Sequence, residues 1–159
     1  MDSLSYSHMA LLEYETSLAY ESLVEKCSDS RVKLLLVSLY EDTKKHANVM
    51  KSVCQSLGQP YPSPMARAQA EMGEIYVDSL KHVRSIKHEI ENGMSLHEAV
   101  KAILEDEKAI SEEYVSLLHS KLRLIEEDDI AIERILKDIA ADEEEHQDLL
   151  KLILDSISH

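Results

Sequence analysis

The sequence contains no phenylalanine and no tryptophan, so seven tyrosines supply all of its aromatic side chains. Only three glycines and three prolines occur among 159 residues, which leaves few positions that interrupt regular structure. The hydrophobic residues, 44% of the chain, recur at helical rather than alternating spacing. The composition therefore predicts an all-α protein, and the length fits a single domain over residues 1–159.

Basic residues are also few, since lysine and arginine together number 17 against 31 acidic residues, for a formal charge of −14. Phosphate binding needs clustered basic side chains, and the lysines here do not cluster, so the sequence predicts no nucleic-acid partner. No apolar run is long enough to span a membrane, and residues 1–5 lack the features of a secretion signal. We therefore expect a soluble, cytoplasmic protein without a membrane partner.

The two cysteines and most of the histidines give no sign of a binding site. Cys27 and Cys54 lack the Cys-x-x-Cys spacing of a zinc knuckle or an iron–thiolate module. Counting along the expected helices places them too far apart for an internal disulfide, so we expect buried or free thiols. The histidines predicted to be surface residues are His8, His82, His88, His97, His119 and His159.

Apolar residues at steps of three and four form four long stripes, which predict four long helices. Short turns join these helices into two hairpins, over residues 4–57 and 95–157, and a further helical pattern over residues 64–92 forms a crossover. Ser95 and Glu98 have the spacing of a capping box at the start of the third long helix. The sequence thus predicts a four-helix bundle with an additional crossover helix.

Each stripe is interrupted near its middle by polar residues, which a core tolerates only when they have partners. The interruptions, in chain order, are Glu13, Thr43, His46, Glu107, Glu143 and His146. Those of the first hairpin lie 14 to 17 residues from the turn at Asp29, and those of the second lie 17 to 20 residues from Glu126. If the hairpins pack side by side, these groups converge at one level of the bundle.

The two hairpins also resemble each other in sequence, which indicates an old duplication. Residues 42–46, Asp-Thr-Lys-Lys-His, align with residues 142–146, Asp-Glu-Glu-Glu-His. Tyr20 and Tyr114 each follow the glutamate of their own stripe by seven residues. Two such copies suit a pseudo-twofold site in which carboxylates bridge two metal ions.

This pattern resembles that of the ferritin-like carboxylate proteins, and most closely the small rubrerythrin-type bundles. That family has one Glu on its first and third helices and Glu-x-x-His on its second and fourth. The resemblance implies a ferritin-like antiparallel bundle with a dinuclear iron centre, for which manganese or zinc are alternatives, and peroxide or dioxygen as the reacting molecule. The implied ligands are Glu13, His46, Glu107, Glu143 and His146, with Tyr20 and Tyr114 as hydrogen-bond donors beside them. The chain lacks the rubredoxin module of characterised rubrerythrins, so a redox cycle would need an external donor.

One ligand of the family pattern is missing, because Thr43 stands where the second helix should carry a glutamate. Asp42, one turn from His46, is an alternative ligand. However, Asp142 occupies the equivalent place beside an intact Glu143, which favours a shared structural role for the two aspartates.

Three classes of function remain open at this point. The first is an oxidoreductase that oxidises Fe(II) or reduces peroxide at the metal pair. The second is a non-catalytic mononuclear metal binder or sensor, which the loss at Thr43 favours. The third is a metal-free helical scaffold or interaction protein whose polar layer fixes the helix register. Apolar flanking residues such as Leu18 and Leu35 permit a homodimer, which we expect, although the sequence does not fix its geometry.

Overall fold

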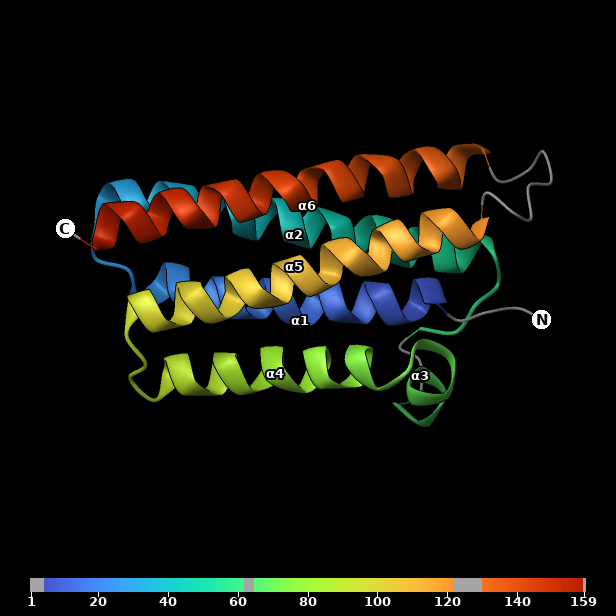
Figure 1. Cartoon of the computed structure of the whole chain (residues 1–159), viewed down its shortest axis with the longest axis horizontal. Helices are drawn as coiled ribbons and strands as arrows, with labels where there is room; N and C mark the ends of the chain where they lie inside the picture. The colour runs from blue at the N-terminus through green and yellow to red at the C-terminus, as the bar shows by residue number, and fades with distance from the viewer. Residues whose placement is uncertain (1–4, 62–64, 122–129, 159) are drawn as a thin grey trace. The chain divides into compact units, whose positions relative to one another are not determined.

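The computed structural model describes residues 5–61, 65–121 and 130–158, and all regular structure within these ranges is helical (Figure 1). The helices are α1 (Ser5–Lys26), α2 (Ser30–Ser56), α3 (Met65–Met72), α4 (Glu74–Glu91), α5 (Leu96–Lys121) and α6 (Ile130–Ile157). The all-α prediction is therefore confirmed. The chain divides into two units, Met1–Ala99 and Val100–His159, which are described separately below. The prediction that they form one domain stays a prediction.

In the first unit, α1 packs against α2, α3 and α4 (Figure 1). The stripe predicted for α1 is buried along its whole length: Met9, Glu13, Thr16, Tyr20, Leu23 and Cys27. A short turn leads into α2, whose N-cap is Asp29; its carboxylate accepts hydrogen bonds from the backbone N–H groups of Arg31 and Val32, at 2.9 and 3.0 Å. These two hydrogen bonds lower the pKa of Asp29. The turn predicted at residues 28–30 therefore lies between α1 and α2, with Asp29 as the N-cap of α2.

The crossover differs from the single helix predicted over residues 64–92, because it is divided at Gly73 into α3 and α4. Gly73 has a φ of 82°, a left-handed conformation that glycine adopts without the steric cost of a side chain. The apolar spacing from Met72 to Tyr76 and Leu80 continues across this break. Periodicity alone therefore predicted one helix where the backbone forms two.

At the junction between α4 and α5, side chains form hydrogen bonds with backbone groups at the end of one helix and the start of the next. The Lys26 ammonium donates hydrogen bonds to the carbonyl oxygens of Ile90 (2.6 Å) and Glu91 (2.8 Å). Its positive charge stabilises the C-terminus of α4, where the helix dipole is negative. Ser95 and Glu98 form the predicted capping box. The Glu98 carboxylate accepts from the Ser95 hydroxyl at 2.9 Å, and the Glu98 N–H donates to that hydroxyl at 3.2 Å.

The second unit contains most of α5 and all of α6. The buried residues of α6 are Leu136, Ile139, Glu143, His146, Leu150 and Ile153, which match the predicted stripe except at its ends, where Ile132 and Ile157 are half-buried. On α5 the stripe is buried from Val100 to Leu117. The acidic turn at residues 126–129 lies outside the described residues. Of the seven tyrosines, six belong to the first unit and only Tyr114 to the second.

The structure corrects the prediction for His8, which is fully buried rather than on the surface. Helix α4 covers this side of α1: the rings of His8 and Tyr76 lie 5.6 Å apart between centroids, and the Tyr76 hydroxyl donates to the His8 carbonyl oxygen at 2.5 Å. His82, His88 and His97 are exposed as predicted, while the side chains of His119 and His159 are outside the description.

Two further predictions concern the thiols and the membrane. Cys27 and Cys54 are both buried free thiols, as predicted. Among the described helices, none combines the length and the apolar character that crossing a membrane requires. The predicted homodimer is untested, although Leu18 and Leu35 are half-buried.

Candidate metal centre

The second unit brings together Glu107 from α5 with Glu143 and His146 from α6, which we call the second half-site. All three side chains are at most 2% exposed. His146 Nδ1 lies 3.7 Å from Glu107 Oε1 and 3.6 Å from Glu143 Oε1, beyond normal hydrogen-bond length. Ligand atoms that each lie about 2.1 Å from one ion are separated by at most roughly 4.2 Å. These spacings therefore suit a shared metal ion, and Glu143 and His146 belong to a buried group able to hold one.

Without a cation, bound protons must offset the carboxylate charge of the second half-site. Burial, and then the negative charge of Glu107, raise the pKa of Glu143 well above its ordinary value. Burial lowers the pKa of His146, but the carboxylates of Glu107 and Glu143 outweigh this effect and raise it. In the metal-free protein this cluster therefore retains protons. A divalent cation would supply the positive charge that these protons otherwise provide.

The first unit contains the corresponding first half-site, formed by Glu13 on α1 with Thr43 and His46 on α2. All three residues are at most 1% exposed. His46 Nδ1 lies 3.8 Å from Glu13 Oε1, close to the spacings in the second half-site. Thr43 contributes a hydroxyl instead of a carboxylate, and this hydroxyl has no hydrogen-bond partner within the part of the chain that the structure describes. The first half-site thus offers one carboxylate and one imidazole.

Asp42 remains an alternative ligand for the first half-site. One of its carboxylate oxygens lies within 4.8 Å of a ring nitrogen of His46. However, its side chain is 32% exposed and makes an ion pair with Lys45 at 2.7 Å. This pairing favours the structural role that the sequence comparison with Asp142 indicated.

Tyr20 and Tyr114 are fully buried on α1 and α5, at equivalent positions of the two hairpins. Each lies two helical turns beyond the glutamate of its own half-site, Glu13 or Glu107. Their predicted role as hydrogen-bond donors beside the ligands stays a prediction.

Sequence periodicity missed one further buried acid, Asp106, which is only 4% exposed. It precedes Glu107 on α5 and lies beside the apolar stripe rather than on it, so its spacing gave no signal. Like His8, it is a buried polar residue that the pattern of a single helix did not predict.

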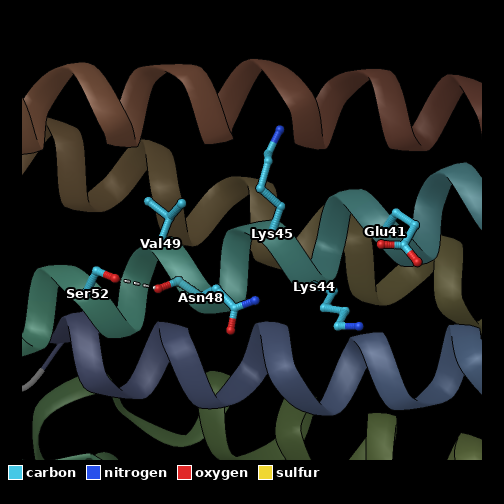
Figure 2. A pocket seen from close by; sticks show the side chains of 6 residues that line it. All are labelled: Glu41, Lys44, Lys45, Asn48, Val49 and Ser52. Atoms are coloured by element: carbon cyan, nitrogen blue, oxygen red, sulfur yellow. Dashed lines mark hydrogen bonds between the residues drawn. The ribbon is translucent and has the colours of Figure 1, made fainter.

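The exposed side of α2 carries a hollow of about 360 Å³ (Figure 2). Unlike the half-sites, it is lined mainly by exposed side chains. Its lining residues are Glu41, Lys44, Lys45, Asn48, Val49 and Ser52. All are exposed except the half-buried Val49, and the Ser52 hydroxyl donates to the Asn48 carbonyl oxygen at 3.0 Å. Thr43 and His46 belong to the opposite, buried set of α2 positions. The hollow therefore offers solvated charge rather than a desolvated ligand set.

No protein-family model, no curated protein and no solved structure matches the chain. The resemblance to ferritin-like proteins therefore depends on the residue pattern alone. To that pattern the structure adds an all-helical chain with a candidate metal-binding cluster of buried histidine and carboxylate side chains.

Proposed function

We propose that this chain is a ferritin-like metal-binding protein with an iron or manganese carboxylate centre that oxidises Fe(II) or reduces peroxide. Glu107, Glu143 and His146 hold the more tightly bound ion. Glu13 and His46 hold a second ion more weakly. Whether the two ions form one dinuclear centre, as the duplicated hairpins predict, is tested by magnetic coupling between them in the electron paramagnetic resonance spectrum.

The observation that supports this proposal is the geometry of the second half-site. Two carboxylates and an imidazole are buried together. The Nδ1 atom of His146 lies 3.6 Å from Glu143 Oε1 and 3.7 Å from Glu107 Oε1. Burying two like charges side by side is unfavourable unless protons or a cation offset them. Carboxylate oxygen with imidazole nitrogen is a ligand set suited to iron, manganese and zinc.

Each side chain has a defined part in this proposal. When bound, iron or manganese supplies Lewis acidity and one-electron redox chemistry. Glu107 and Glu143 neutralise the charge of the ion, and His146 fixes its position beside them. Tyr20 and Tyr114 orient the ligands through their hydroxyls, so Tyr→Phe variants at these positions should change turnover more than metal content. Burial of the site excludes bulk water from the reaction.

A second candidate function is a non-catalytic, mononuclear metal binder or sensor. The hydroxyl of Thr43 favours this alternative, because the first half-site lacks one of the two carboxylates that the second half-site has. Turnover with peroxide or Fe(II) separates the two candidates. A metal-free scaffold is the third outcome of the same test.

The test is metal content on protein purified without a metal-affinity tag and reconstituted with Fe(II), Mn(II) or Zn(II). We expect the tightly bound ion to be lost in Glu143→Ala and retained in Glu144→Ala, a matched control at the adjacent, exposed position of α6. Peroxide consumption and Fe(II) oxidation are then assayed on the loaded protein.

Three outcomes are distinguishable. Metal binding with turnover supports the oxidoreductase. Metal binding without turnover leaves the binder or sensor. Protein that binds none of the three metals, with Glu143→Ala indistinguishable from wild type, leaves a scaffold with a polar core.

A further inference from the structure

Thr43 carries a buried hydroxyl that the fold itself does not use. Its side chain is fully buried on α2, and among the described residues no group hydrogen-bonds its Oγ1 atom. A buried hydroxyl without a partner destabilises a folded protein. A threonine within a helix can avoid this cost by donating to the carbonyl four residues earlier. Thr16 on α1 does so, with its hydroxyl 2.8 Å from the Leu12 carbonyl oxygen.

The unused hydroxyl stands at the ligand position of the first half-site. Thr43 precedes His46 by three residues, so both side chains lie on one face of α2, and His46 in turn contacts Glu13. The equivalent position of the second hairpin is occupied by Glu143, whose carboxylate lies beside His146. A neutral hydroxyl is a weak ligand, but it both donates and accepts hydrogen bonds to water.

The two half-sites also differ in the charge that they offer a divalent cation. Glu107 and Glu143 together balance two positive charges, whereas Glu13 alone balances one. A cation in the first half-site would retain a net positive charge in a desolvated environment, which weakens its binding. A water molecule at the missing ligand position completes its coordination, and that molecule needs a hydrogen-bond partner on the protein.

Given the proposed metal-binding function, we propose that the Thr43 hydroxyl holds a water ligand of a divalent cation bound by Glu13 and His46. This water is the exchangeable ligand of the first half-site. The first half-site therefore takes up and releases its ion, while the second half-site retains its own. Thr43 acts as a positioning residue, because it acts on the cation through the water molecule.

The experiment is a titration of the full-length, metal-free protein with Co(II), followed by calorimetry and visible absorption. Wild type should show a tight and a weak binding step. The weak step should disappear in His46→Ala and the tight step in Glu143→Ala. In Thr43→Val the weak step should weaken about tenfold and its absorption spectrum should change, while the tight step is unaltered.

Metal-free stability provides an independent readout. Thr43→Val should raise the melting temperature of the metal-free protein, because it removes an unsatisfied hydroxyl from the core. Thr16→Val is the matched control: it removes a satisfied hydroxyl, so it should lower the melting temperature and leave the weak step unchanged. Thr43→Ser keeps a hydroxyl and should keep the weak step, which makes it the rescue variant.

Two results would overturn the inference: a weak step within twofold of wild type in Thr43→Val, or a weak step lost equally in Thr43→Ser and Thr43→Val. Failure of the proposed function looks different. In that case wild type binds no Co(II), or both steps persist unchanged in Glu143→Ala.

Discussion

The first and second half-sites occupy equivalent positions in two segments of the sequence that align with each other, but they differ in charge. Glu13 and Glu107 are both buried, as are His46 and His146. At the remaining position, one hairpin has the hydroxyl of Thr43 and the other the carboxylate of Glu143. The comparison separates two properties of a buried site. Helical spacing determines that these positions are desolvated, whereas the residue type at a single position determines how much cation charge can be balanced.

The largest effect is expected from Glu143→Thr, which turns the second half-site into a copy of the first. The variant loses a direct ligand and one of two negative charges, so affinity for the tight ion should fall roughly 100-fold or more. Calorimetric titration with Mn(II) measures this change. Glu144→Thr, at the exposed neighbouring position, should bind like wild type. An unchanged tight step in Glu143→Thr would contradict the role of Glu143 as a ligand.

The reverse substitution, Thr43→Glu, should give the first half-site the charge of the second. We expect a second tightly bound ion per chain and a lower melting temperature of the metal-free protein, because another carboxylate is buried. Metal content and thermal unfolding with and without Mn(II) measure both effects. Thr43→Gln has the same length without the charge and should not gain the ion. Equal metal content in Thr43→Glu and Thr43→Gln would refute the charge argument.

A smaller effect is expected of pH on the unfolding free energy of the metal-free protein. Glu143 can titrate, whereas Thr43, at the equivalent position of the first half-site, cannot. The raised pKa of Glu143 means that the folded carboxyl keeps its proton above pH 4.5, the ordinary glutamate pKa, where the unfolded chain has released it. The folded state then binds more protons, so this group lowers the unfolding free energy as pH rises from 4.5 through the folded pKa.

Thermal unfolding of the metal-free protein across this pH range, compared with Glu143→Gln, isolates the contribution of this carboxyl. The variant cannot take up this proton, so its stability should decrease less steeply with pH. Identical pH profiles for the two proteins would mean that Glu143 titrates alike in the folded and unfolded states.

The smallest effect is expected from Asp42→Asn. Asp42 is paired with Lys45 and is partly exposed, so its charge should contribute little to the first half-site. Co(II) affinity of the weak step should change less than about threefold, well below the 10- to 100-fold typical of groups that support metal ligands. A tenfold or greater loss would instead identify Asp42 as the ligand that replaces the missing glutamate.

The buried polar residues of both half-sites were predictable from spacing alone. Glu13, Glu107 and Glu143 each continue a stripe of aliphatic residues at steps of three and four, and each is at most 1% exposed. Helical spacing predicts these buried positions correctly because the apolar stripe in a helix's own sequence determines which face it buries. Their assignment as metal ligands goes further, since it depends on a family resemblance and on the charge imbalance that burial creates.

Features that depend on packing between helices or on backbone conformation were not predictable from the spacing of residues within one helix. His8 is buried because α4 covers its side of α1, and the pattern of α1 alone does not specify which side the crossover takes. The break at Gly73 arises from a backbone conformation, while the side-chain period continues through it. The unused hydroxyl of Thr43 depends on the three-dimensional fold, because a threonine in a helix ordinarily has a backbone acceptor within reach.

The uneven distribution of aromatic residues gives the chain a built-in spectroscopic asymmetry. Tyrosine is the only strong near-ultraviolet chromophore and fluorophore here, and six of the seven tyrosines belong to the first unit. Intrinsic emission and near-ultraviolet circular dichroism therefore report mainly on the first unit. Replacing Tyr114 with Phe would confine the tyrosine signal to that unit, while a single tryptophan introduced into α6 would report on the second. Unfolding of the two units could then be followed in one sample without any attached dye.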